Sequence, residues 1–170
     1  MPLRWLAPRS PLRSLLSRQH PLRESTAVLC FQLCRTPSVR KDDRPQKYER
    51  WADDAARSAV ISTNRKRLII AGFLTEACVS FSALSALKDG FEVSIVADAC
   101  GGLTAAGHDL ALRRLEQAGA QLTSWIQVLL EFQRDWTRHE TYEAARAIVV
   151  ANGGGYGMGL AYAREMIHPG

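Results

Sequence analysis

Cys78 is the residue whose type and position most favour chemistry in this 170-residue chain. An apolar run from Arg67 to Gly72 predicts a buried strand, and Thr75 is the expected N-cap of the helix that follows. Cys78 then falls in the first helical turn, where free backbone N–H groups and the helix dipole favour a thiolate. The same N–H groups can receive an oxyanion when the sulfur attacks a carbonyl. The alternative is a small apolar residue packed at a strand–helix junction.

The elements that position Cys78 alternate between short strands and amphipathic helices, which is typical of a parallel α/β sheet. Strands are expected over residues 67–72, 91–97 and 121–123. Helices are expected over residues 52–62, 75–88, 104–117, 125–133, 140–151 and 156–166. Because the strand at 67–72 is apolar throughout, we expect it to lie centrally or to be covered by residues 26–32, which have β character.

A glycine-rich segment from Gly153 to Gly159 lies between the last two expected helices. The dinucleotide-binding pattern GxGxxG would need a glycine at Met158, and no strand leads into the segment. The segment also lacks the Gly-Lys-Ser/Thr ending of a P-loop. It is therefore predicted to be a flexible link between two helices.

The net charge of +5 is concentrated in the N-terminal part of the chain. Residues 1–41 hold eight Lys or Arg against Glu24 alone, so they carry +7 and the other residues sum to −2. The Arg, Ser and Leu content of the opening segment is typical of an organellar transit peptide, but Pro2, Pro8, Pro11 and Pro21 interrupt any continuous amphipathic helix. Residues 1–43 are predicted to be a disordered or non-native segment, and residues 44–170 to be the domain.

Other composition features exclude several protein classes. The basic segment lacks the interleaved aromatic residues of a nucleic-acid-binding surface. No apolar run approaches the roughly 18 residues that a membrane span needs. Cysteines 30, 34, 78 and 100 have neither zinc-site spacing nor the density of a disulfide scaffold, so we expect reduced thiols, a cytoplasmic location and neither metal nor cofactor.

The segment from Gly72 to Val79 reads Gly-Phe-Leu-Thr-Glu-Ala-Cys-Val. It resembles the Gly-x-x-Thr-Glu-x-Cys-Val signature of the isochorismatase-like cysteine hydrolases. Further matches follow in the expected order at residues 89–93, 97–99, 117–123, 131 and 134–136. The last of these is similar to the YcaC-type branch, whose physiological substrates are poorly defined. The resemblance covers residues 44–136 and continues weakly to the end.

The resemblance implies a three-layer α/β/α parallel sheet of the isochorismatase-like type, with missing or altered N-terminal strands. In that family a nucleophilic cysteine works with an aspartate, which accepts and returns the thiol proton, and with a lysine that stabilises negative charge. Cys78 matches the nucleophile. The backbone N–H groups of Leu74 and Cys78 match the oxyanion hole, and the Phe73–Leu74 bond matches a non-proline cis peptide.

Two other family positions are less well matched. Arg44, followed by Pro45 and then by Trp51, is the candidate for the cationic role, and the alternative is a solvated arginine beside two aspartates. The family aspartate ends the first strand in a context like Val-Asp-x-Gln. Its nearest counterpart here is Leu29-Cys30-Phe31-Gln32, which has cysteine in place of the acid. The metal ligands of the nicotinamidase branch come from the same region, so no metal is implied.

Three further polar residues in the matched region have ordinary structural interpretations. Asp98 is expected to orient a loop, His108 to lie on a helix surface, and Cys100 to be structural. None of them can be placed as a replacement proton acceptor from the sequence.

The resulting hypothesis is a hydrolase that acts on a small amide or related carbonyl compound by cysteine nucleophilic catalysis, with activity impaired by loss of the aspartate. The alternative is a catalytically inactive remnant with a structural role in an oligomer. The YcaC-type resemblance implies a homo-oligomer. The expected partner is a small-molecule substrate, with no nucleic acid and no membrane.

Overall fold

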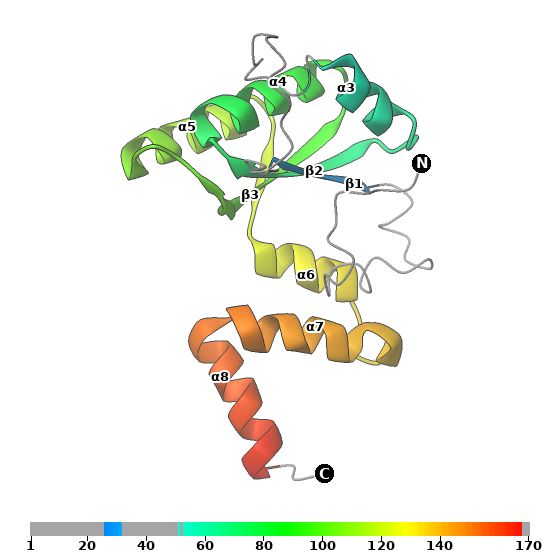
Figure 1. Cartoon of the computed structure of the whole chain (residues 1–170), viewed down its shortest axis with the longest axis vertical. Helices are drawn as coiled ribbons and strands as arrows, with labels where there is room; N and C mark the ends of the chain where they lie inside the picture. Colours follow the sequence, from blue (N-terminus) through cyan, green and yellow to red (C-terminus); the bar gives the residue numbers. More distant parts are fainter. Residues whose placement is uncertain (1–25, 32–50, 52, 168–170) are drawn as a thin grey trace, which may run out of the picture. The chain divides into compact units, whose positions relative to one another are not determined.

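The computed structural model describes residues 26–31, 51 and 53–167, and all structural statements concern these (Figure 1). They fall into two compact units, one that extends to Trp125 and one that begins at Ile126. Each unit is described by itself. The candidate site belongs to the first.

The first unit is built on a sheet of four parallel strands in the order β1-β2-β3-β4. The strands are β1 (Thr26–Phe31), β2 (Arg67–Phe73), β3 (Glu92–Gly101) and β4 (Gln121–Thr123). In the register of the first pair, Thr26 lies opposite Arg67 and Phe31 opposite Gly72. β2 therefore lies between β1 and β3, which confirms that the strand expected at 67–72 is central in the sheet, with residues 26–31 beside it.

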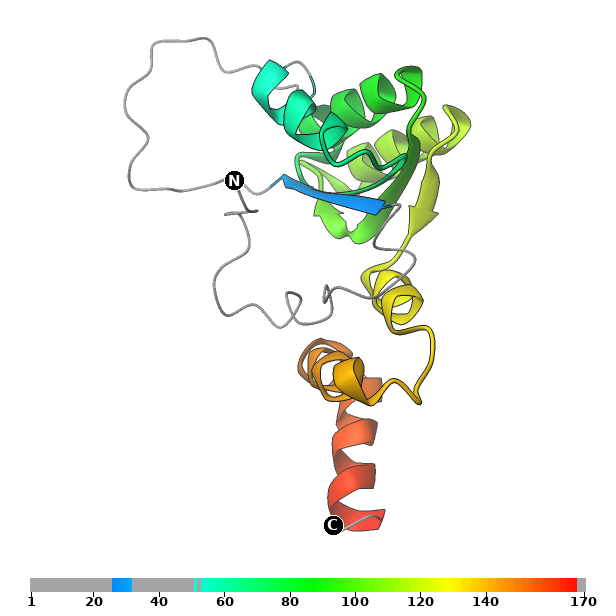
Figure 2. The same ribbon diagram turned by 90° about the vertical axis from the view of Figure 1, so that its right-hand side faces the viewer.

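Three helices lie on one face of this sheet (Figures 1 and 2). They are α3 (Asp54–Ile61), α4 (Ser80–Lys88) and α5 (Ala105–Gln117). Leu68, Ile70 and Ile95 of the sheet and Leu115 of α5 have no exposed surface and belong to one apolar cluster. The continuous apolar run of β2 is thus explained by burial on both of its faces.

The ends of α5 follow the expected signals. Thr104 is the N-cap, and its Oγ1 accepts a hydrogen bond from the Gly107 N–H at 3.0 Å. Gly119 follows the helix with a φ of +100°, which an L side chain rarely adopts. The predicted cap at Thr104 is confirmed.

The start of the Cys78-bearing helix differs from the prediction. A short π-helical turn, η2 (Thr75–Val79), precedes α4, and the capping position is Leu74, which makes no side-chain capping bond. The assignment of Thr75 as N-cap is wrong. Its hydroxyl lies 2.9 Å from Nδ1 of His108 instead, so the side chain is used for a contact with α5.

The second unit consists of helices: α6 (Trp125–Gln133), which begins at its boundary, α7 (His139–Asn152), α8 (Gly154–Tyr162) and a π-helical turn, η3 (Ala163–Ile167). The buried Gln133 side chain fixes the turn between α6 and α7. Its Nε2 donates to the carbonyls of Asp135 and Arg138, and its Oε1 accepts from the Thr141 hydroxyl.

The glycine-rich segment is helical from Gly154 onwards, so the predicted flexible link is wrong. A Cβ on Gly157 would lie 2.5 Å from the Val149 carbonyl oxygen and 3.1 Å from the Cα of Val150. Glycine at this position therefore allows α7 and α8 to approach closely.

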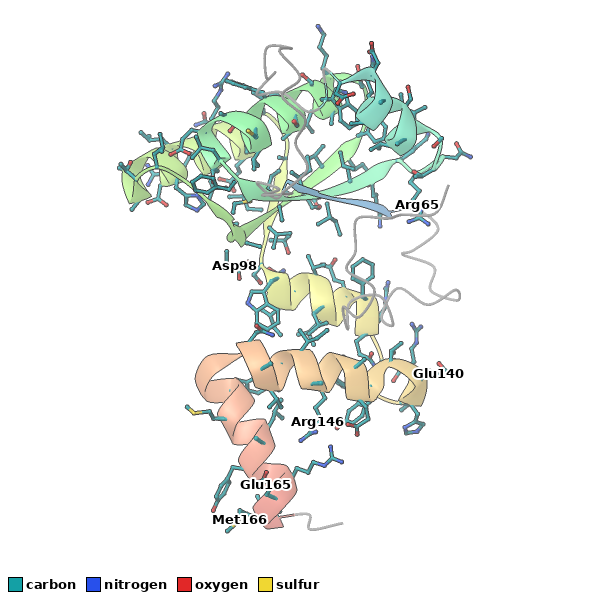
Figure 3. All side chains as sticks on the ribbon, in the orientation of Figure 1. Arg65, Asp98, Glu140, Arg146, Glu165 and Met166 are labelled. Atoms are coloured by element: carbon teal, nitrogen blue, oxygen red, sulfur yellow. The ribbon has the colours of Figure 1, made fainter. Side chains whose placement is uncertain are left out.

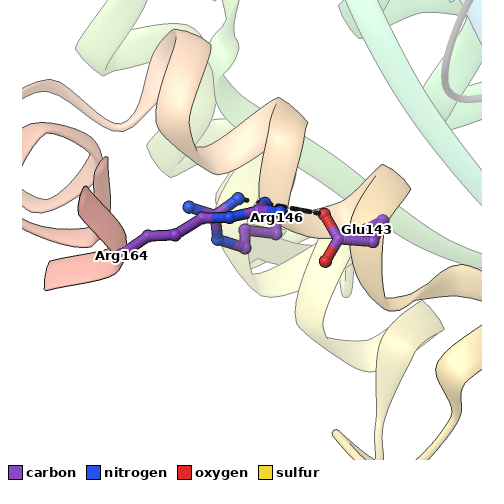
Figure 4. A network of polar contacts seen from close by, with 3 residues as sticks. All are labelled: Glu143, Arg146 and Arg164. Atoms are coloured by element: carbon purple, nitrogen blue, oxygen red, sulfur yellow. Dashed lines mark hydrogen bonds and ion pairs between the residues drawn. The ribbon is translucent and has the colours of Figure 1, made fainter. Parts of the chain in front are cut away.

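An ion-pair network also links α7 to the last turn of the chain. The Glu143 carboxylate lies 3.2 Å from Arg164 and 3.8 Å from Arg146 (Figure 4). None of the helices in the described ranges is long and apolar enough to cross a membrane.

Candidate functional site

Cys78 lies just beyond the carboxyl end of β2, in the turn that leads into α4. Gly72, with a φ of +147°, precedes the Phe73–Leu74 bond, and that bond is a cis peptide, as the resemblance implied. The carboxyl ends of parallel strands meet at one edge of the sheet, where open α/β folds bind ligands. Cys78 is therefore at the edge where a substrate site is expected.

The backbone around Cys78 leaves N–H groups without their usual helical partners. The Leu74 carbonyl accepts from the N–H of Ala77 at 3.2 Å and from the N–H of Val79 at 3.1 Å. Within the described part of the chain, the Cys78 N–H does not bond to this carbonyl, as it would in a regular α-helix, and the Leu74 N–H donates no hydrogen bond. The Leu74 amide beside the thiol can thus donate to a ligand, and the Cys78 amide is not held by the Leu74 carbonyl.

The Cys78 side chain is a free, half-buried thiol. No described side chain or backbone group forms a hydrogen bond with its sulfur. The site thus places a free thiol beside backbone N–H groups. The residues described around it do not supply a proton acceptor in contact with the thiol.

Two side chains of η2 reach across to α5 and to the loop that precedes it. The Thr75 hydroxyl pairs with His108 Nδ1, and Oε1 of Glu76 accepts from the Leu103 N–H at 2.9 Å. Oε2 of Glu76 is buried without a hydrogen-bond partner. The contact of Glu76 was not predicted, although the residue is part of the matched signature. His108 is on a helix, as predicted, but its side chain is half-buried and contacts Thr75.

Two glycines provide the space for the Glu76 carboxylate. A Cβ on Gly102 would lie 2.8 Å from Oε1, and a Cβ on Gly107 would lie 2.7 Å from the same atom. The two glycines were the sequence signal that could have revealed a buried contact at this place.

The other polar residues of the matched region have structural partners. Asp98, labelled in Figure 3, lies within β3 and accepts a hydrogen bond from the Trp125 N–H at 2.8 Å. It thereby orients the start of α6. Cys100 is also in β3, partly buried against the apolar cluster.

Asp89, in the matched segment 89–93, joins the residues before α3 to the turn after α4. Its Oδ2 accepts from Trp51 Nε1 at 2.8 Å and pairs with Arg57 at 2.8 Å. The Trp51 hydrogen bond, with help from the Arg57 charge, lowers the pKa of Asp89. Trp51 is buried and meets Phe91 edge to face at 5.2 Å. This part of the matched pattern is structural.

Arg44 and the proposed boundary between residues 43 and 44 lie outside the described residues. In β1, the backbone register places Cys30 opposite Ala71. Among the residues that the structure describes, no cluster of three or more His, Cys, Asp or Glu is arranged to hold a metal ion.

Comparisons with known proteins agree with this fold. The chain is 46% identical over 93 residues to the "Probable hydrolase YcaC" of Escherichia coli (strain K12), a match that covers 55% of this chain and 45% of that protein. A solved structure of E. coli YcaC, described as an octameric hydrolase of unknown specificity, has a TM-score of 0.66 and 35% identity. It matches over 73% of this chain and 59% of its own.

YcaC from Pseudomonas aeruginosa, solved with hexane-2,5-diol and covalent acrylamide, also has a TM-score of 0.66, with 36% identity over 72% of this chain and 59% of its own. The chain therefore spans only about half the length of the curated relative that it matches. The model of the isochorismatase domain matches residues 39–127, a little more than half of the chain. The chain belongs to the isochorismatase family, with the α/β fold of its YcaC-type members.

Proposed function

We propose that this chain is a hydrolase of small amides or related carbonyl compounds, with Cys78 as the nucleophile. The observation that carries the proposal is the place of the half-buried Cys78 thiol at the carboxyl end of β2. Beside it lie the Leu74 N–H, which donates to no described group, and the Cys78 N–H, which does not bond the Leu74 carbonyl. Support also comes from the Pseudomonas relative, which holds covalent acrylamide. Acrylamide is an electrophile that thiolates attack.

The proposed reaction has two steps. The Cys78 sulfur attacks the substrate carbonyl carbon while the amides of Leu74 and Cys78 donate to the developing oxyanion. The C–N bond then breaks, the amine leaves with a proton, and a thioester remains until water hydrolyses it. Arg44 is the proposed cation near the thiolate, where it can stabilise negative charge but cannot exchange protons near neutral pH.

Thiol labelling tests the proposal without knowledge of the substrate. The full chain is treated with limiting iodoacetamide at pH 7, and the rate constant at each cysteine is measured by peptide mass spectrometry. Cys78 is expected to react faster than Cys100, because Cys78 lies at the start of a helix beside the Leu74 N–H, which donates to no described group. A Cys78→Ser variant identifies the labelled peptide. Faster labelling of Cys100 would overturn the assignment of the nucleophile.

A second candidate function is a structural role in a homo-oligomer. The solved E. coli YcaC is described as octameric. In this chain, the segment formed by α8 and η3 exposes more than 60% of each of five large apolar side chains: Tyr156, Met158, Tyr162, Met166 and Ile167. A group of exposed apolar side chains on one segment marks a surface that a partner can cover.

Light scattering coupled to size-exclusion chromatography separates the two functions. An oligomer that contains an unreactive Cys78 would favour the structural role, whereas a reactive Cys78 favours the hydrolase whether or not the chain associates. A Met158→Lys variant is expected to lower the mass of the oligomer if α8 lies in the interface.

The cytoplasmic location stays a prediction.

A further inference from the structure

Glu76 and Thr75 connect the turn that carries Cys78 to a separate part of the fold. Glu76 Oε1 accepts from the Leu103 N–H at 2.9 Å, and the Thr75 hydroxyl lies 2.9 Å from His108 Nδ1. Leu103 precedes α5, and His108 is in its first turns. Both contacts thus join η2 to the N-terminal end of α5.

The surroundings of Glu76 are shaped to its carboxylate. Both glycines that surround Oε1, Gly102 and Gly107, would place a Cβ less than 3.0 Å from it. Neither glycine has the positive φ that would require glycine for backbone reasons. The Glu76 carboxylate therefore needs the space at both positions, although a Cβ at Gly102 would also lie 2.8 Å from the Cβ of His108.

The carboxylate also lies where a negative charge is favourable. Its Oε1 lies close to Gly107 in the first turn of α5, where an added Cβ would meet it. The N-terminus of a helix carries a partial positive charge. Thr104 binds the Gly107 N–H, and Glu76 binds the Leu103 N–H just outside the helix. Glu76 therefore adds to the N-cap from a different element of the chain.

We propose that Glu76 is a positioning residue that holds the Cys78 turn against the N-terminus of α5. The Leu74 carbonyl accepts from the N–H groups of Ala77 and Val79, and the Thr75 carbonyl accepts from the Ser80 hydroxyl. These bonds tie η2 to its own chain neighbours and not to the rest of the fold. The contacts of Thr75 and Glu76 fix it from outside. The position of the thiol relative to the free amides then depends on the Glu76 carboxylate. The inference rests on the proposed role of Cys78 as nucleophile.

The test is the pH profile of Cys78 alkylation in the full chain, measured for wild type, Glu76→Ala, Glu76→Asp and Glu76→Gln. Glutamine has the length and the acceptor oxygen needed for the Leu103 N–H, so its rate and pH midpoint should remain close to wild type. Alanine lacks the acceptor, and aspartate is one methylene shorter. Both should slow alkylation at pH 7 about tenfold and raise the pH midpoint.

The direction of the change separates positioning from simple charge repulsion. If Glu76 acted only through its negative charge, glutamine and alanine would both lower the pH midpoint and speed alkylation, and the proposal would be overturned. Glu116 is an exposed glutamate on α5, and Glu116→Ala is the matched control, expected to leave the profile unchanged.

Two further measurements keep the outcomes distinct. Hydrogen exchange at the Leu103 amide should be faster in Glu76→Ala and Glu76→Asp, which checks the contact itself. If Glu76→Ala does not fold, the test rests on Glu76→Asp. A pH profile of Cys78 alkylation in Glu76→Asp that matches wild type overturns the proposal. If Cys78 in the wild-type chain is no more reactive than Cys100, the proposed function is wrong. If Cys78 is reactive and its reactivity is the same in all Glu76 variants, only the positioning role of Glu76 is wrong.

Discussion

Replacing Leu115 with alanine is a direct test of how α5 holds the sheet. The Leu115 side chain has no exposed surface and belongs to the apolar cluster that includes Ile70 and Ile95 of the sheet. Leu→Ala at such a site removes buried methyl and methylene groups and leaves a cavity, which costs about 3 kcal/mol of unfolding free energy. For a chain of this size, that corresponds to a fall in melting temperature of about 6–12 °C.

The matched control is the same substitution at Leu110, on the same helix. Leu110 is 65% exposed, so its loss removes little packing and should change the unfolding free energy by less than about 0.5 kcal/mol. Urea unfolding followed by tryptophan fluorescence gives both values, with calorimetry for the melting temperature. The described packing of α5 is wrong if Leu115→Ala lowers the unfolding free energy by less than about 1 kcal/mol with an unchanged m-value. It is also wrong if Leu110→Ala lowers the unfolding free energy as much as Leu115→Ala does.

The remaining predictions concern pH, capping and activity. The lowered pKa of Asp89 means that its carboxylate stabilises the fold above the ordinary pKa and loses this effect as pH falls through the lower, folded value. In Asp89→Asn, the unfolding free energy measured with urea should therefore fall less steeply as the pH drops below about 4. The same pH dependence as wild type in this range would contradict this. Thr104→Ala should cost about 1 kcal/mol in urea unfolding, because the Gly107 N–H loses its acceptor, and a cost near zero would count against the cap. Cys30→Asp, with Cys30→Asn as control, should raise amide hydrolysis by roughly 10² to 10⁴ if it supplies the missing base. A gain that survives Cys78→Ala would count against this mechanism.

The strands and most helices could be predicted from the sequence because local patterns determine them. The run at 68–70 is apolar because Leu68, Ile69 and Ile70 of β2 are all buried, and Gly119 marks the end of α5. The length of β3 could not be predicted. The register between β2 and β3 shifts between Ile70 and Gly72. After the shift the two strands pair again, with Phe73 opposite Gly101, so β3 continues to Gly101. Such a shift depends on a partner strand that is distant in the sequence.

The candidate site was predicted in part. The signature located Cys78 and the cis bond before Leu74, since these are local features of one turn. The contacts of Thr75 and Glu76 with residues beyond β3 were missed, because they join positions that only the fold brings together. The glycines at 102 and 107 marked that contact, but their meaning depends on what lies beside them.

The register of β1 limits where a proton acceptor for Cys78 can come from. The carboxyl ends of β1 and β2 lie at the same edge of the sheet, with Phe31 opposite Gly72. A residue at the end of β1 therefore lies on the strand next to the one that leads to Cys78. β1 reads Thr-Ala-Val-Leu-Cys-Phe and contains no carboxylate. Since none of the described residues bonds to the thiol, β1 and the described surroundings of Cys78 provide for attack on a carbonyl but not for the proton transfers of rapid turnover. Acylation without efficient hydrolysis is therefore the behaviour that we expect of this chain as it stands.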